Sequence, residues 1–184
     1  EKADHLQSRF TGWMLLNYNK PVLVSSTFGT HYANNIVDEN IKTYWSAKTA
    51  DKGEWLISDL GEESTIHAIQ INYADQDVEF SGKQQGTYHQ YIVYSSPDGK
   101  NWKKLIDKSQ NKKDVPHDYI ELEKSVKARY LKLENIHMPT GKFAISGFRA
   151  FGLGSGQKPE AVKQFIALRN DDTDRRNGWL KWQP

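Results

Sequence analysis

Apolar and polar residues alternate along most of this chain in short segments, and residues typical of turns separate the segments. In residues 64–74 the isoleucines at 69 and 71 and the tyrosine at 73 share one face by period-two alternation. The same alternation predicts strands over residues 21–26, 54–61, 64–74, 88–96, 103–109, 117–126, 128–136 and 143–152. We expect Gly61 to end the second of these strands, and a short helical turn at residues 35–38.

Many short strands at regular spacing, with turn signals between them and no long amphipathic helix, are typical of an all-β protein. The predicted fold class is therefore an antiparallel β-sandwich. The loop over residues 75–87 is longer than most hairpin connections, and long loops of this kind are often functional.

Composition narrows the possible functions. The 184 residues are 37% hydrophobic and 26% charged, with a net charge of only +2, which argues against a nucleic-acid partner. No apolar run approaches the ~20 residues of a membrane span, so no membrane insertion is expected. The absence of cysteine excludes disulfides and thiolate chemistry. The 6 tryptophans and 9 tyrosines suit either a β-rich core or a carbohydrate or protein interface.

The segment GLGSGQKPE, residues 152–160, has the composition of a linker. We therefore expect three parts: an N-terminal segment that packs on the domain (1–19), the sandwich itself (20–153), and a linker with the first strands of a second, truncated domain (154–184). The first ten residues lack the basic-then-apolar pattern of a signal peptide. If the protein is exported, this chain is expected to be cut from a longer precursor.

The stretch NNIVDENIKTYWSA, residues 34–47, places Asp38, Asn40 and Thr43 close together, just before Trp45. Carboxylate, amide and hydroxyl oxygens at this spacing suit a calcium loop, or a loop closed by its own Asx-type hydrogen bonds. Trp45 either anchors the loop to the core or offers a flat apolar face to a ligand.

Six segments in order over some 130 residues carry a resemblance to a known family: VSS, VDENIKTYWSA, EWLISDLG, YIVYSSPDGKNWKKL, ARYLKLE and ISGFRAFG. They resemble the landmarks of the discoidin-like domains, also called coagulation-factor C-type domains, which include carbohydrate-binding modules of family 32. The sequence of these segments is most similar to the discoidin-like domain of large bacterial enzymes of the family 43 glycoside hydrolase type. In those proteins a fibronectin type III-like domain follows, and RRNGWLKWQP resembles its first strands.

The resemblance implies a galactose-binding-domain-like jelly roll and a structural calcium site to which Asp38, Asn40 and Thr43 would contribute. In metal-binding members a glutamate just before the last strand completes the site. That position is Gly147 here, or Ser146 with a shift of one residue. A weaker calcium site and a loop closed by its own hydrogen bonds both stay open. Trp45 and Trp55 fall at core positions of the family.

The resemblance also implies a sugar site in the loops. The arginine and asparagine of galactose-binding members are missing from residues 75–87, so galactose specificity does not carry over. The loops offer a different set, in which each aromatic can equally pack its own loop and each histidine can equally be a surface or hydrogen-bonded residue. The candidate carbohydrate-binding residues are His31, Tyr32, Phe80, Gln84, Gln85, Tyr88 and His89.

No catalytic residues are assigned. Asp75, Asp77 and Glu79 lie close together, but three acids on one loop are more simply a solvated loop, and no nucleophile or metalloprotease motif is present. We expect a non-catalytic carbohydrate-binding or accessory module of a secreted polysaccharide-degrading enzyme of bacteria. It would be secreted, periplasmic or at the cell surface, with plant or host polysaccharides and oligosaccharides and the neighbouring catalytic domain as partners. The alternative is a purely structural spacer that orients the catalytic domain; membrane or protein adhesion ranks last because the loop tips are mostly polar.

Overall fold

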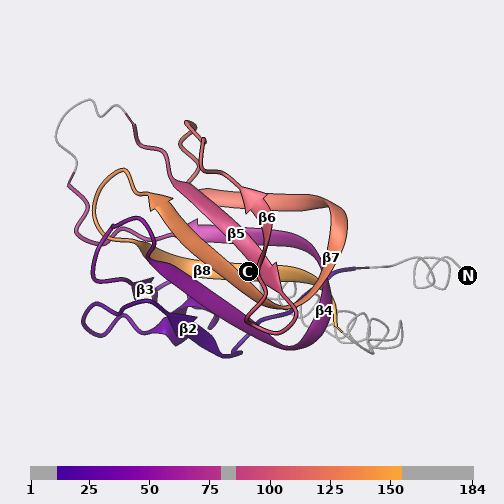
Figure 1. Cartoon of the computed structure of the whole chain (residues 1–184). Coiled ribbons are helices and arrows are strands. Elements are labelled where there is room, and N and C mark those ends of the chain that lie inside the picture. Colours follow the sequence, from indigo (N-terminus) through magenta and orange to yellow (C-terminus); the bar gives the residue numbers. More distant parts are fainter. Residues whose placement is uncertain (1–11, 80–85, 155–184) are drawn as a thin grey trace, which may run out of the picture. The chain divides into compact units, whose positions relative to one another are not determined.

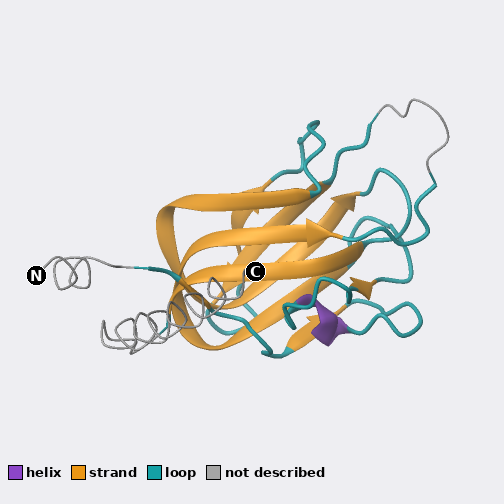
Figure 2. Ribbon diagram, turned by 180° about the vertical axis from the view of Figure 1, so that it is seen from behind, coloured by secondary structure: helices purple, strands orange, loops and turns teal. Residues whose placement is uncertain are grey.

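Antiparallel strands make up nearly all the secondary structure in the described part of this computed structural model, residues 12–79 and 86–154 (Figures 1 and 2). The fold class is confirmed, since every strand pairing there is antiparallel. The elements are β1 (Met14–Leu15), β2 (Val22–Val24), the 3-10 helix η1 (Ala33–Ile36), β3 (Trp45–Ser46), β4 (Trp55–Tyr73), β5 (Gln90–Ser96), β6 (Lys103–Asp107), β7 (His117–His137) and β8 (Ala144–Leu153).

Two long strands, β4 and β7, run through both layers of the sandwich. The first half of β4 pairs with β2 and with the second half of β7, which in turn pairs with β5, and β5 pairs with β6. The second half of β4 lies between the first half of β7 and β8, and β8 also pairs with β1 and β3. One hydrogen-bonded sheet therefore folds over to form both layers.

The expected break at Gly61 is wrong. Gly61 adopts φ +79°, a left-handed conformation that glycine tolerates, and the pairing of β4 with β7 is interrupted between Asp59 and Ser64 before it resumes. The irregularity turns the strand without ending it. Likewise residues 117–126 and 128–136, expected as two strands, form the single strand β7. A bulge interrupts the period-two pattern, which is why one bent strand resembles two in the sequence.

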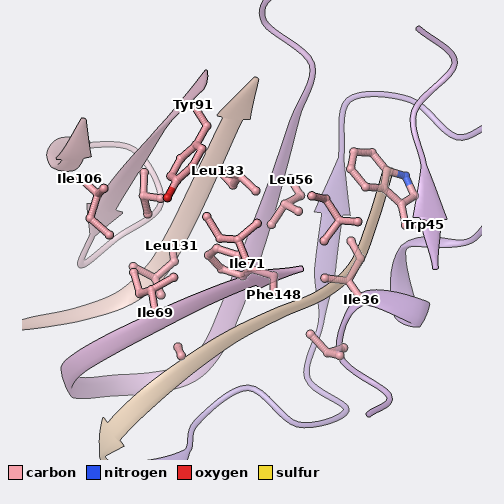
Figure 3. Close-up of a cluster of buried hydrophobic side chains, with 14 of the residues drawn as sticks. Ile36, Trp45, Leu56, Ile69, Ile71, Tyr91, Ile106, Leu131, Leu133 and Phe148 are labelled. Atoms are coloured by element: carbon pink, nitrogen blue, oxygen red, sulfur yellow. The ribbon is translucent and has the colours of Figure 1, made fainter. Parts of the chain in front are cut away.

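The inward side chains of both layers form one apolar core (Figure 3). Trp45 is fully buried there, its ring edge-on to Phe143 with 5.5 Å between centroids, and its indole Nε1 donates to the carbonyl oxygen of Ser26 at 3.0 Å. The core interpretation of Trp45 is therefore confirmed. Trp55 is only partly buried, and the Lys132 ammonium lies 5.9 Å from its ring centroid.

The bends of β4 and β7 lie at one end of the sandwich, and the loops that follow these strands lie at the opposite end with β3 and its neighbouring loops (Figure 1). Met14 and Leu15 pair with β8, so the sheet includes residues assigned from sequence to the N-terminal segment. The domain limits themselves, and the second domain expected beyond residue 154, lie outside what the described residues test. Within the described residues, no helix has the length and apolarity to cross a membrane.

Candidate functional site

Two loops are held against each other at the loop-bearing end: residues 74–79 after β4, and residues 138–143 between β7 and β8. The backbone N–H of Lys142 donates to the carbonyl of Gln76 at 2.9 Å, and the Lys142 ammonium forms an ion pair with Asp77. Gly141 makes this close approach possible. It has φ +72°, and a Cβ at this position would lie 2.4 Å from the Gln76 carbonyl oxygen.

A third loop, residues 108–116, is fixed beside them. The Asn111 amide nitrogen donates to the backbone oxygens of His89 (3.0 Å) and Lys113 (2.8 Å), and Asn111 accepts from the side chain of Gln90. The N–H of Tyr73 donates to the Pro116 carbonyl at 3.0 Å. The bonds of Asn111 to His89 and of Tyr73 to Pro116 join residues that are 22 and 43 positions apart along the chain.

A cavity of about 290 Å³ lies among these loops. That volume is at the lower end of the range for small-ligand pockets, roughly 300–1,000 Å³, and suits one sugar ring better than a long chain. Its lining mixes apolar side chains with carboxylates, hydroxyls and imidazoles: Tyr73, Ala74, Asp75, Val78, Thr87, His89, Asp114, Pro116, His117, Met138, Pro139 and Thr140.

Tyr73 and His89 line this cavity, and each carries a buried polar side-chain atom. Their rings stack with 3.8 Å between centroids, and the residues are 7% and 9% exposed. Among the described residues neither the Tyr73 hydroxyl nor His89 Nδ1 has a hydrogen-bond partner, which is uncommon for buried polar groups. Burial lowers the pKa of His89 to about 4 and raises the pKa of Tyr73. Near neutral pH the imidazole is therefore uncharged and the phenol protonated.

A stack of three rings lies beside the cavity. The ring of His31 is 4.2 Å from that of Tyr44 and 6.5 Å from that of Phe28, both nearly parallel to it. The Tyr44 hydroxyl donates to the side-chain oxygen of Gln76 at 2.7 Å, which ties the stack to the loop at residues 74–79. Phe28 is 37% exposed, and the Lys142 ammonium lies 4.5 Å from its ring centroid.

The sequence-predicted sugar residues fall in different places. His31 belongs to the ring stack and His89 to the cavity, where it is buried rather than a surface histidine. Tyr32 is 60% exposed, and Tyr88 tilts against His137 at 5.0 Å. The predicted residues Phe80, Gln84 and Gln85 lie outside the described residues.

Sequence reasoning missed several residues that shape this end of the molecule: Tyr44, Tyr73, Gln76, Asp114, Met138 and Thr140. The alternation in residues 64–74 correctly placed Tyr73 on the same face as Ile69 and Ile71, which is buried. That pattern does not indicate that Tyr73 also lines a cavity. Asp114 follows Lys112 and Lys113 in a polar segment to which no function was assigned from the sequence. A signal was available at Asp75, which was noted as one of three acids and assigned to a solvated loop.

The loop predicted to bind calcium is closed by its own hydrogen bonds. Asp38 Oδ1 accepts from the N–H of Asn40 at 2.9 Å, and Asp38 Oδ2 accepts from the Thr43 hydroxyl at 2.6 Å. The Asn40 side-chain oxygen accepts from the N–H of Lys42 at 3.1 Å. Asp38 and Asn40 therefore each close an Asx-type turn, and the Thr43 hydroxyl is held by the second carboxylate oxygen of Asp38.

The guanidinium of Arg149 lies next to this loop. Arg149 Nε donates to both carboxylate oxygens of Glu39, at 2.8 and 3.0 Å, and its Nη1 donates to the Asn72 side-chain oxygen at 2.7 Å. The guanidinium also covers Gly147, because a Cβ there would lie 2.7 Å from Nη1. A carboxylate at residue 147 would have to displace it.

The donor set therefore fits a calcium ion poorly. Calcium takes six to eight oxygens and gains affinity from each carboxylate, whereas the carboxylate of Glu39 is held by Arg149. The described part contains no cluster of three or more His, Cys, Asp or Glu side chains suited to a metal. Calcium binding by Asp38, Asn40 and Thr43 stays a prediction, and the hydrogen bonds favour the alternative of a self-closed loop.

Comparison with known structures gives the class of fold. A chitosan-binding module of a chitosanase/glucanase from Paenibacillus sp. IK-5 is 20% identical and aligns with a TM-score of 0.62, covering 76% of this chain and 99% of that chain. The second such module from that enzyme, solved with chitotriose, is 21% identical with a TM-score of 0.62, covering 74% and 99%. The module CpGH89CBM32-4 of Clostridium perfringens, in complex with GlcNAc-α-1,4-galactose, is 12% identical with a TM-score of 0.59, covering 79% and 98%.

These structures are discoidin-like jelly-roll modules, and at such low identity the likeness concerns the fold alone. The sequence goes further. Residues 22–146 match the F5/8 type C domain, so the chain belongs to the F5/8 type C (discoidin-like) family. A comparison with curated protein sequences gives no match.

Proposed function

We propose that this domain is a non-catalytic carbohydrate-binding module, with the cavity between the three loops as its sugar site. The observation that carries the proposal is a cavity of one-ring size lined by Tyr73 and His89, two residues whose hydroxyl and Nδ1 are buried without a partner among the described residues. A polyol that supplied hydrogen-bond partners there would remove a desolvation cost of about 1–3 kcal/mol per group. The apolar walls at Val78 and Met138 suit the C–H face of a pyranose.

The comparisons support this class of ligand. Modules of the same fold were solved with chitotriose and with a GlcNAc-galactose disaccharide, so the fold accommodates short oligosaccharides. The ring stack adds apolar surface beside the cavity, with Phe28 partly exposed, and a second sugar unit would contact it there.

The test is a titration of the isotopically labelled 184-residue chain with oligosaccharides, followed by amide chemical shifts. Chitooligosaccharides, a GlcNAc-galactose disaccharide and fragments of xylan, arabinan and galactan form the panel. We expect saturable shifts confined to the cavity loops, residues 74–79, 86–89, 111–117 and 138–143. The hairpin at residues 97–102 is the internal control. Shifts centred on that hairpin, or no shift with any glycan, would contradict the proposal.

We further propose that the module serves a secreted, family 43-type glycoside hydrolase that degrades plant or host polysaccharide, and that a fibronectin type III-like domain follows it. Support comes from the sequence resemblance described above. The test compares the intact parent polypeptide with a form lacking residues 20–153. We expect equal turnover of a small soluble substrate and slower hydrolysis of insoluble polysaccharide by the shortened form. Equal rates on the insoluble substrate would count against a targeting role.

A structural spacer is the second candidate, because large apolar side chains are exposed on strands β1, β7 and β8 of one layer. Met14, Tyr119 and Leu153 are 39%, 52% and 37% exposed. A spacer would bind no glycan, yet its removal would lower the thermal stability of the adjoining catalytic domain. The two functions are therefore separated by the glycan titration together with a melting experiment on the parent polypeptide.

A further inference from the structure

We propose that the cavity prefers a sugar unit carrying a positively charged amine over the same unit with a neutral substituent. This inference rests on the proposed function, since it specifies the ligand of the same site. It is based on the acidic side chains that line the cavity.

Among the described residues that line the cavity, two are carboxylates and none is a lysine or an arginine. Asp75 comes from the loop after β4, and Asp114 from the loop between β6 and β7. Lys112 and Lys113 precede Asp114 in the chain, but neither lines the cavity. Apart from the two histidines, the charged groups of the described lining are therefore both acidic.

The two carboxylates differ from neighbouring acids that already have partners. Asp77 pairs with Lys142, and Asp118 accepts from the Tyr91 hydroxyl at 2.7 Å and lies 3.9 Å from the Lys108 ammonium. Asp75 and Asp114 form no ion pair with any residue of the described ranges. Their charge is left for water or for a ligand.

The histidines of the cavity do not balance this charge. Burial keeps the pKa of His89 low, at about 4, although the negative charges of Asp114 and Asp75 act in the opposite direction. Asp75 and Asp114 are therefore near enough to His89 to influence its titration. His117 also lines the cavity, and its Nδ1 is 2.8 Å from the amide nitrogen of Asn72.

The buried groups give an independent indication of a polar guest. Tyr73 and His89 line the same cavity, and their hydroxyl and Nδ1 lack partners among the described residues, so the site suits a ligand with hydroxyl groups rather than a purely apolar one. Hydroxyls on one part of the guest and an ammonium on another match these polar groups and the two carboxylates. An amino sugar such as a glucosamine unit combines both.

The experiment is calorimetric titration of the full chain with three tetrasaccharides. They share a β-1,4-linked glucose-type backbone and carry at C2 an ammonium, an N-acetyl group or a hydroxyl. At pH 5.5, where the amine is protonated, two exposed charge contacts predict binding of the amine form tighter by roughly 2- to 30-fold. Raising the salt to ~0.5 M should remove most of this preference, because exposed charge contacts are screened.

The test variant is the double substitution D75N/D114N, and the matched control is E63Q/E123Q, which changes the net charge equally on exposed acids outside the cavity. We expect the test variant to lose the amine preference while still binding the neutral forms, and the control to keep it. Equal binding of all three sugars by the unmodified chain would overturn the charge inference but leave the proposed function intact. An equal loss in both variants would show only a general electrostatic attraction. No binding of any sugar would refute both proposals.

Discussion

Arg149 connects the loop at residues 38–43 to the sheet, and its replacement by methionine is the most informative single test of how that loop is held. The side chain is 17% exposed and Glu39 is 34% exposed. Arg149 binds Glu39 through Nε and Asn72 through Nη1. Methionine keeps the apolar stem and removes both interactions.

The expected cost lies between that of a surface ion pair, about 0.2–1 kcal/mol, and that of a buried pair broken on one side, about 3–5 kcal/mol. Partial burial and the additional hydrogen bond to Asn72 place it at roughly 2 kcal/mol. For a domain of this size, each kcal/mol shifts the melting temperature by roughly 2–4 °C, so we expect a decrease of about 4–8 °C.

The assay is thermal unfolding followed by circular dichroism, for the unmodified chain, R149M, E39Q and the double variant. Non-additive losses would measure the Arg149–Glu39 coupling directly. E39G adds a useful contrast, because Glu39 adopts φ +56° and glycine relieves that backbone strain while also removing the carboxylate. We therefore expect E39G to melt above E39Q.

Each melt is repeated with calcium and with a chelator. If Arg149 and the Asx turns hold the loop, the melting temperature of the unmodified chain should not depend on calcium. A ligand that binds only the folded state at 100 times its dissociation constant stabilises by about 2.7 kcal/mol, which these melts would detect. A calcium-dependent rise in the unmodified chain, together with a negligible effect of R149M, would refute this reasoning and support the predicted calcium site.

Three further outcomes are expected. G141A should destabilise the fold by about 2 kcal/mol or more in denaturant unfolding and weaken glycan binding, because its Cβ meets the Gln76 carbonyl and its φ is positive. The Arg129 guanidinium lowers the pKa of Asp59. The pair therefore stabilises the fold above the ordinary aspartate pKa, and this stabilisation is lost as the pH falls through the lowered pKa. D59N should flatten the acid limb of a stability–pH profile. W45A should cost about 3–5 kcal/mol in the same unfolding assay, and a loss below 1 kcal/mol would contradict its place in the core.

The sequence predicted much of the fold because strand periodicity and turn chemistry are local properties. The alternation in residues 64–74 correctly placed Ile69, Ile71 and Tyr73 on the buried face. It failed at Gly61, since a bulge that bends one strand and a turn that ends it contain the same kinds of residue. Whether pairing resumes afterwards depends on the partner strand.

The candidate site was predicted less completely. Histidines and aromatics in loops near a long connection pointed to His31 and His89, and both lie at the loop-bearing end. The stacking partners Tyr44 and Tyr73 were missed because alternation assigns a residue to a face of a strand and not to its neighbours in space. Asp114 was missed because its loop is held beside the cavity by hydrogen bonds to residues distant in sequence, such as that of Asn111 to His89 and that of Tyr73 to Pro116.

By itself, the sequence determined the class of fold, the buried position of Trp45 and the family landmarks, since these depend on residue types at short spacing. Only the tertiary structure decided which distant residues meet. Arg149 contacts Glu39 across 110 positions, and the cavity joins three loops that the pairing of β4 with β7 and β8 brings to one end. Such contacts follow from strand register and loop packing, which are non-local, and it is these contacts that set the charge and shape of the proposed sugar site.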